Sequence, residues 1–232
     1  DGLRCVVGIE SDELMREEGC DSERLGENVS ELLEGETQVV YGFSRGDTGE
    51  IVQQSLSKLR SLTRQGKICP TQIVDLDPLV DAMRLLKSAA ELDQMMRANN
   101  ISVVAHKRAM SVCKVGMNEF QLAAEVYHQF SVQGSQRLAN GSLVAGGHNA
   151  CMLHYTNNDQ VLQDGDLVLI DAGCELDHYA SDITRTFPVN GRISEAQKTI
   201  YELVLSAHTA ALACIKPGAV FADMQNAAVE VI

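Results

Sequence analysis

Two aspartates in the stretch DLVLIDAGCELDHYASDITRTF, residues 166–187, are the residues whose types and spacing point most directly to chemistry. Asp171 ends an apolar run that is typical of a buried strand, and Asp182, eleven residues later, is expected inside a second strand. A turn centred between Leu176 and Asp177 would place the two carboxylates directly opposite each other. Facing Cβ atoms lie about 4.5–5.5 Å apart, and like charges there destabilise a sheet.

Three arrangements would remove this repulsion. The two carboxylates can share one proton, as the carboxyl pair of an acid dyad does. A hard cation such as Mn²⁺ or Mg²⁺ can lie between them, because such ions prefer oxygen ligands. One or both aspartates can instead face solvent at a strand end. The spacing alone leaves these alternatives open.

His154 is the next candidate, in the stretch CMLHYTNND between apolar residues and a polar turn. It is either a structural histidine or a group beside a metal site, as a hydrogen-bond donor or as a ligand. His106 and His128 fall on predicted helices, where we expect structural roles. The chain contains no HExxH zinc motif, no GxSxG nucleophile elbow, no phosphate-binding loop and no dinucleotide fingerprint.

The elements that must position these residues follow from the periodicity of the chain. Residues 1–77 are expected to be part of a small α/β domain, because helix and strand patterns alternate there. The helices are predicted at 28–34 and 47–62, and the strands at 37–43 and 71–80, the last running into a turn at Pro78.

A second domain is predicted from residue 78 to residue 232. Ser88 and Glu91 form a capping box that opens a long helix, which we expect to end near Gly116. Between the second helix and the third lies a β-rich region with turn signals, which contains the aspartate pair. The helices after the first are expected at 117–134, after Ser194 and near Phe221.

Composition narrows the classes of function. The net charge of the 232 residues is −13, and no basic stripe is present, which argues against nucleic-acid binding. Residues 1–35 hold eleven acidic and three basic side chains, which predicts a solvated face. No apolar run reaches the length of a membrane span, so we expect no membrane partner. The seven cysteines are scattered, which favours a reducing compartment such as the cytoplasm.

Three stretches of the sequence resemble a known family. LHYTNND, DGDLVLIDAGCELDHYASDITRTFPVNG and SEAQKTIYELVL resemble the catalytic domain of aminopeptidase P, the Xaa-Pro aminopeptidase family of the pita-bread metallopeptidases. The resemblance is specific over residues 145–220 and looser outside them. It implies an α+β fold in which residues 78–232 form the N-terminal half of a pita-bread domain, a curved antiparallel sheet with outer helices. Residues 1–77 would be the C-terminal part of an α/β domain.

The resemblance also implies roles for individual residues. Asp171 would chelate one Mn²⁺ ion, Asp182 would bridge two, and His154 would donate to the substrate as a catalytic group. Thr184 would hydrogen-bond a metal carboxylate. The implied reaction releases an N-terminal residue linked to proline, so proline-containing peptides are the expected partners. A homo-oligomer is implied as well, in the cytoplasm or, as the second candidate, the mitochondrion.

The sequence departs from the family pattern in two respects. The family uses five metal ligands, and its later histidine and two glutamates have no counterpart before Ile232. We therefore expect a truncated chain that is inactive as a fragment. The segment 137–141 also differs from the aromatic- and proline-containing run of relatives. A prolidase-type dipeptidase and a non-catalytic pita-bread module that binds peptides or proteins remain alternatives.

Overall fold

The computed structural model describes residues 29–43 and 46–232 of the chain. Its contacts divide the chain into two units, between Lys87 and Ser88. The domain boundary predicted after Asp77 stays a prediction, and the acidic run of residues 1–35 lies mostly outside the described residues. Among the described helices, none combines the length and the apolar character that crossing a membrane requires.

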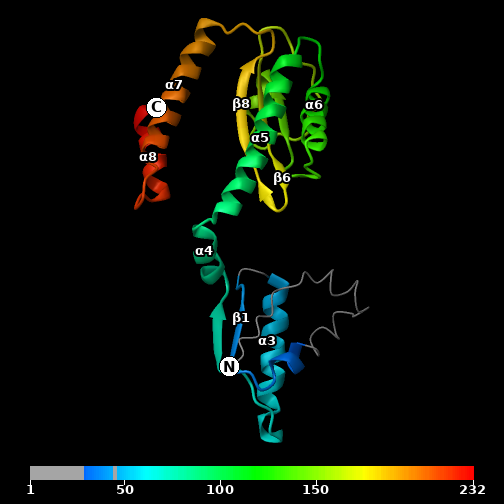
Figure 1. The fold of residues 1–232 in the computed structure, drawn as a ribbon, viewed down its shortest axis with the longest axis vertical. Coiled ribbons are helices and arrows are strands. Elements are labelled where there is room, and N and C mark those ends of the chain that lie inside the picture. Colours follow the sequence, from blue (N-terminus) through cyan, green and yellow to red (C-terminus); the bar gives the residue numbers. More distant parts are fainter. Residues whose placement is uncertain (1–28, 44–45) are drawn as a thin grey trace. The chain divides into compact units, whose positions relative to one another are not determined.

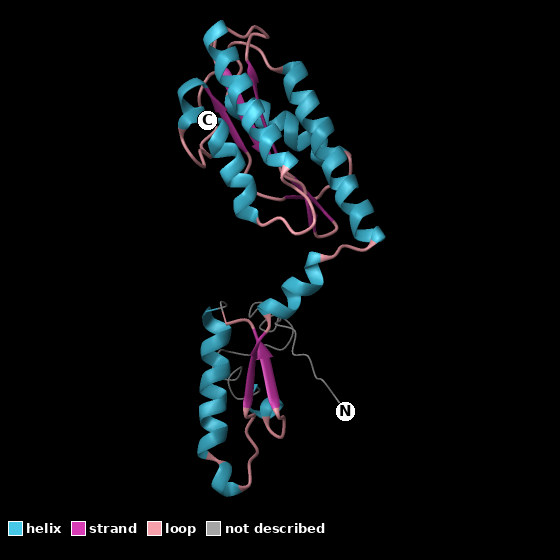
Figure 2. Ribbon diagram, turned by 90° about the vertical axis from the view of Figure 1, so that its left-hand side faces the viewer, coloured by secondary structure: helices cyan, strands magenta, loops and turns pink. Residues whose placement is uncertain are grey.

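The first unit has the alternating order that the sequence predicts. Its strands β1 and β2 pair in parallel, beside the long helix α3 (Figure 2). Apolar side chains of β1 and α3, among them Val39, Leu56 and Leu59, form its core. The described elements are a helix over 29–33, β1 (Gln38–Tyr41), α3 (Gly46–Ser61), the 3₁₀ turn η1 (Thr63–Gln65), β2 (Gln72–Asp75) and α4 (Asp77–Leu85).

The turn predicted at Pro78 is wrong. Pro78 lies in the first turn of α4, a nine-residue helix. The first N–H groups of a helix have no partner within the helix, so a proline there removes no helical hydrogen bond. Its fixed φ also suits the helical backbone. A proline after a strand therefore opens a helix in this chain, where the sequence favoured a turn.

The second unit contains the predicted helices with the predicted starts. Capping boxes at Ser88 and Ser194 open α5 and α7, as the sequence indicates. The elements in order are α5 (Ala89–Val112), α6 (Glu119–Val132), β3 (Arg137–Leu138), β4 (Leu143–Gly146), the 3₁₀ turn η2 (Gly147–Cys151), β5 (Leu167–Ala172), β6 (Cys174–Leu176), β7 (Tyr179–Ala180), β8 (Ile183–Pro188), α7 (Glu195–Ala213) and α8 (Phe221–Val231).

Two small antiparallel sheets lie at the centre of this unit. Their strand orders are β4-β5-β8 and β3-β6-β7. Helices α5 and α6 pack against each other and against the strands, as the ribbon in Figure 1 shows. Buried Leu122, Phe130, Val168 and Ile170 join the two layers into one core. The α+β class predicted for this region is therefore present.

The predicted hairpin register is wrong. The turn residues are Asp177 and His178, whose φ angles are 48° and 70°, so Leu176 pairs with Tyr179. Two-residue hairpin turns favour residues with positive φ because that backbone matches the twist of the strands. The turn therefore lies one residue later than predicted, and Asp171 faces Thr184 instead of Asp182.

Candidate functional site

Asp171 lies near the end of β5, the central strand, which pairs with β4 on one side and β8 on the other. It is opposite Leu143 of β4 and Thr184 of β8. The carboxylate oxygen Oδ1 is buried and has no hydrogen-bond partner among the described residues. Buried polar atoms are almost always paired, so an unpaired carboxylate oxygen calls for a further partner, either a bound group or a proton shared with a neighbouring carboxylate.

Asp182 lies two residues before Thr184, which is the strand partner of Asp171. Its carboxylate is close enough to that of Asp171 for a charge interaction and a hydrogen bond. Partial burial and the neighbouring charge and hydrogen bond of Asp171 raise the pKa of Asp182 above its usual value. The structure thus brings the two aspartates together, although not in the predicted register.

Asp182 lies outside the strands, in a break between β7 and β8. The backbone N–H of Cys174 donates to the side-chain Oγ of Ser181 at 3.0 Å, where a regular ladder would use a backbone carbonyl. The Ser181 carbonyl lies instead where a Cβ atom on Gly173 would be. Glycine at position 173 therefore permits the close backbone approach that turns Asp182 out of the ladder.

His154 lies on an exposed turn and adopts a left-handed backbone, with a φ of 55°. Its imidazole makes no hydrogen bond with the residues that the structure describes, and no ion pair joins it to either aspartate. Its loop returns to the strand end beside Asp171, because Asn158 accepts from the Val144 N–H at 2.8 Å and donates to the Ser142 carbonyl at 3.0 Å. The loop is ordered by other residues, and His154 is left facing solvent.

A fully buried carboxylate, Glu119 at the start of α6, holds this loop in place. Oε1 accepts from the Gly146 N–H at 2.8 Å and from Asn149 Nδ2 at 3.1 Å. Oε2 accepts from the Tyr155 hydroxyl at 2.8 Å and from the Gln160 N–H at 3.0 Å. Burial and the hydrogen bond to Glu119 raise the pKa of Tyr155 to about 12, so the tyrosine remains a donor at neutral pH.

Replacing Glu119 by glutamine should destabilise the protein. In the glutamine side chain, an NH₂ group replaces one of the two carboxylate oxygens. Its N–H donors would then face the N–H or O–H groups that donate to that oxygen in the parent protein. We expect a loss of about 2–3 kcal/mol in the free energy of unfolding, measured by urea denaturation. Glu125→Gln is the matched control on the same helix, because Glu125 pairs only with Arg108 at the surface. It should cost less than about 1 kcal/mol, and equal losses in both variants would contradict the assignment.

Among the buried polar residues, Glu119 and Ser102 were not singled out from the sequence, and His106 was expected only to have a structural role on a helix. Ser102 and His106 lie one helical turn apart in α5, in a stripe otherwise made of apolar residues such as Ala98 and Ala105. Burial lowers the pKa of His106, and the charge of Arg185 lowers it further, against the opposing Ala172 carbonyl and Asp171. A polar pair at i and i+4 within an apolar stripe was the signal that could have identified two of them.

Two further predictions concern the surroundings of the aspartates. Thr184 lies opposite Asp171, but its hydroxyl makes no hydrogen bond with the described residues, so its predicted role stays a prediction. The atypical segment 137–141 lies beside the strand break, because the Ala139 N–H donates to the Gly173 carbonyl at 3.0 Å.

The donor set at this site fits a hard divalent cation. Asp171 and Asp182 supply neighbouring carboxylates, and one of their oxygens is buried without a partner. Among residues 29–43 and 46–232, no third His, Cys, Asp or Glu joins them in a cluster that could hold a metal ion. The described residues therefore offer such an ion two carboxylates and no third ligand of these types.

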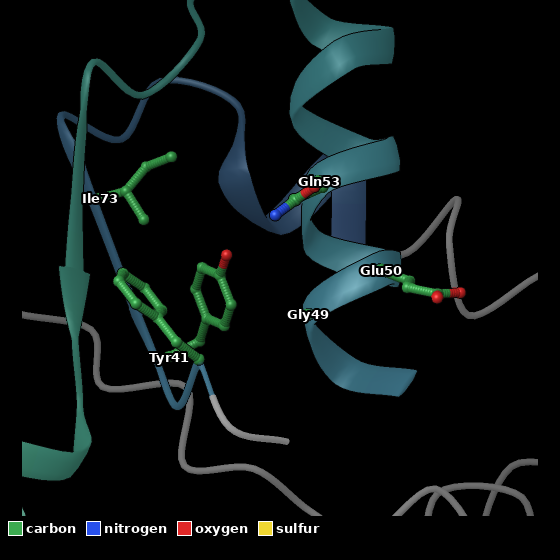
Figure 3. A pocket seen from close by; sticks show the side chains of 6 residues that line it. Tyr41, Gly49, Glu50, Gln53 and Ile73 are labelled. Carbon is green, nitrogen blue, oxygen red and sulfur yellow. The ribbon is translucent and has the colours of Figure 1, made fainter. Parts of the chain in front are cut away.

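A pocket in the first unit offers no comparable chemistry. Its lining places the ring of Tyr41 opposite Ile73 and Gly49, and the Glu50 carboxylate points away from the ring (Figure 3). The remaining lining residues are Phe43 and Gln53. One carboxylate and one amide do not form a set of converging catalytic groups, so the aspartate pair is the candidate site.

Comparison with known proteins places the chain in a family. The model of metallopeptidase family M24 matches residues 93–232. The chain is 40% identical over 211 residues to an Xaa-Pro aminopeptidase of Escherichia coli, which covers 90% of this chain and 47% of that protein. It is 37% identical over 158 residues to an Xaa-Pro dipeptidase of Pongo abelii, which covers 66% of this chain and 32% of that protein.

A solved structure gives the same result for the fold. The aminopeptidase PepP of Pseudomonas aeruginosa superposes with a TM-score of 0.82 at 41% identity, covering 95% of this chain and 54% of that chain. The predicted α+β fold, as part of a pita-bread domain, is thereby confirmed. The chain spans about half the length of the Escherichia coli and Pseudomonas aeruginosa relatives. By sequence and by fold, the chain belongs to metallopeptidase family M24.

Proposed function

We propose that this chain contributes to the active site of a metal-dependent aminopeptidase that releases an N-terminal residue linked to proline. The observation that carries the proposal is the Asp171 carboxylate, whose Oδ1 is buried and unpaired beside the second carboxylate of Asp182. Membership of family M24 and the similarity to Xaa-Pro aminopeptidases support the same activity.

Asp171 and Asp182 are the proposed ligands of Mn²⁺ ions. Manganese suits a site of carboxylate oxygens, and the positive charge would offset the repulsion between the two aspartates. Such an ion, when bound, would supply an activated water and polarise the peptide carbonyl. The three further ligands that the resemblance implies, one histidine and two glutamates, are not provided by the described residues. We therefore propose that the 232-residue chain is inactive by itself.

His154 is the proposed catalytic donor to the substrate. Its exposed imidazole is unpaired among the described residues, so both ring nitrogens can meet a bound peptide. A donor held in place before reaction stabilises the charge that develops on a carbonyl oxygen. The Glu119 contacts at Asn149 and Tyr155, on either side of His154, hold the loop that carries it.

Peptide hydrolysis tests the proposal directly. The product of the complete reading frame that encodes these residues should release the first residue of an Xaa-Pro-Yaa tripeptide with Mn²⁺, and the 232-residue chain should release none. Chelation should abolish the release and added Mn²⁺ should restore it, as measured by chromatography of the free amino acid. Robust Mn²⁺-dependent cleavage by the 232-residue chain would show that the proposed ligand set is wrong.

The same assay separates the alternatives. Cleavage of Xaa-Pro dipeptides but not of tripeptides would indicate a prolidase, the activity named for the Pongo abelii relative. Peptide binding without cleavage by the complete product would indicate a non-catalytic module.

We also propose a cytoplasmic location, because the described cysteines Cys69, Cys113, Cys151, Cys174 and Cys214 are all free thiols. The homo-oligomer implied by the resemblance is testable by size-exclusion chromatography.

A further inference from the structure

Helix α5 buries two polar side chains against the strands that flank the aspartate pair. Ser102 is 0% exposed and His106 is 3% exposed, within a face that is otherwise apolar. Burying a hydroxyl or an imidazole is unfavourable unless each group finds a hydrogen-bond partner. The partners of both side chains are residues directly adjacent in sequence to the two aspartates.

Ser102 holds the residue that precedes Asp182. The Ser102 and Ser181 hydroxyl oxygens are 2.7 Å apart, and Ser181 is 2% exposed. Ser181 Oγ also accepts from the Cys174 N–H and lies 3.1 Å from the Cys174 carbonyl. Since Ser181 has one proton, these three contacts are satisfied when it donates to that carbonyl and Ser102 donates to it. The Ser102 hydroxyl thereby stabilises the strand break from which Asp182 emerges.

His106 holds the residue that follows Asp171. Its Nε2 is 3.3 Å from the carbonyl oxygen of Ala172, which is fully buried. A carbonyl only accepts, so Nε2 carries the proton in this hydrogen bond. The other nitrogen, Nδ1, is buried without a partner among the described residues. His106 is thus tied to β5 through the Ala172 carbonyl, and the backbone of Ile183 in β8 is the second backbone group that acts on it.

We propose that Ser102 and His106 are positioning residues that set the separation of Asp171 and Asp182 for metal binding. The inference rests on the proposed function of the two aspartates. Strand pairing fixes Asp171 directly but Asp182 only through its neighbours, because Gly173 and Ser181–Asp182 lie outside the strands and the Cys174 N–H donates there to a side chain. A single rigid helix that contacts the neighbour of each aspartate supplies the missing constraint and opposes the repulsion between the carboxylates.

Manganese affinity tests this inference in the product of the complete reading frame. Ser102→Ala and His106→Phe should each weaken Mn²⁺ binding about tenfold, the lower end for groups that orient metal ligands. Ser102→Thr keeps the hydroxyl and should restore the affinity. Ser111→Ala is the matched control, because Ser111 lies on the same helix and bonds only the Arg108 carbonyl at the surface. Titration calorimetry gives the affinities, and thermal unfolding of the metal-free proteins reports their stability.

The outcomes are distinct. Weakened Mn²⁺ binding in Ser102→Ala and His106→Phe, with recovery in Ser102→Thr and none of the effect in Ser111→Ala, would establish the positioning role. Unchanged affinity in Ser102→Ala, even with a lower unfolding temperature, would reduce Ser102 to a packing residue and overturn the inference. Asp171→Asn separates this inference from the proposed function: if it binds Mn²⁺ as the parent does, the metal site itself is wrong and both proposals fall.

Discussion

Asp182→Ala is expected to abolish the release of the N-terminal residue from Xaa-Pro-Yaa peptides by the complete product. Removing a proposed bridging carboxylate should lower kcat/KM by more than about 100-fold, which is the upper range for groups that only orient a ligand. Among the described residues, no third His, Cys, Asp or Glu clusters with Asp171 and Asp182, so no neighbouring side chain can replace the lost carboxylate. Initial rates at saturating Mn²⁺, followed by release of the free amino acid, give the measurement.

The control for this variant is Asp164→Ala. Asp164 is an exposed aspartate that lies before β5, outside the strands. Its Oδ1 accepts from Asn190 Nδ2 at 2.8 Å, and none of the hydrogen bonds of the described residues joins it to the aspartate pair. This variant should retain the parent activity. Full activity in Asp182→Ala would remove Asp182 from the proposed ligand set.

The Asp182 carboxylate, although proposed to be needed for activity, should lower the stability of the metal-free protein at neutral pH. The pKa of Asp182 is raised in the folded state by partial burial and by Asp171, so the folded protein binds this proton more tightly than the unfolded chain. Stability therefore falls as pH rises from the ordinary aspartate pKa of about 3.9 through the raised value. At pH 7, Asp182→Asn should unfold at a higher temperature than the parent in the absence of metal, and a lower unfolding temperature would contradict the stated electrostatics.

Gly173→Ala is expected to have the second large effect. A Cβ atom at position 173 would overlap the carbonyl oxygen of Ser181, and that contact is with backbone, so no side-chain rotation relieves it. We expect a loss of about 3 kcal/mol in the free energy of unfolding, the upper range for overpacking a filled interior. The displaced segment carries Asp182, so Mn²⁺ affinity should fall as well. Urea denaturation and titration calorimetry measure the two effects.

Gly141→Ala provides the comparison for this variant. A Cβ at position 141 meets no atom within 4 Å, and the residue needs no left-handed backbone. Its stability should remain within about 0.5 kcal/mol of the parent. If Gly173→Ala were as stable as Gly141→Ala, the close approach of Ser181 to Gly173 could not be what shapes the strand break.

The helices of this protein were predictable because their signals are local. A capping box joins Ser88 to Glu91, and another joins Ser194 to Gln197, so each helix start is encoded within four residues. The apolar run that ends at Asp171 likewise indicates a buried strand through its residue types alone. Pro78 shows the limit of local signals, since the same residue suits both a turn and the first turn of a helix.

The arrangement of the site depends on contacts between residues far apart in the chain. Ser102 meets Ser181, His106 meets Ala172, and Glu119 meets Tyr155, across sequence separations of 79, 66 and 36 residues. No local pattern encodes such pairs, because their partners become neighbours only after the helices pack on the strands.

The sequence by itself determined the residue types: two aspartates at the end of a buried strand and beyond a hairpin, with a family resemblance that implied metal ligands. Only the tertiary structure decided their geometry. The positive φ angles of Asp177 and His178 moved the turn by one residue, and the Ser181 side chain replaced a backbone acceptor in the ladder. Asp182 therefore meets Asp171 from outside the ladder, because a register is set by backbone conformation and long-range hydrogen bonds, which residue spacing does not record.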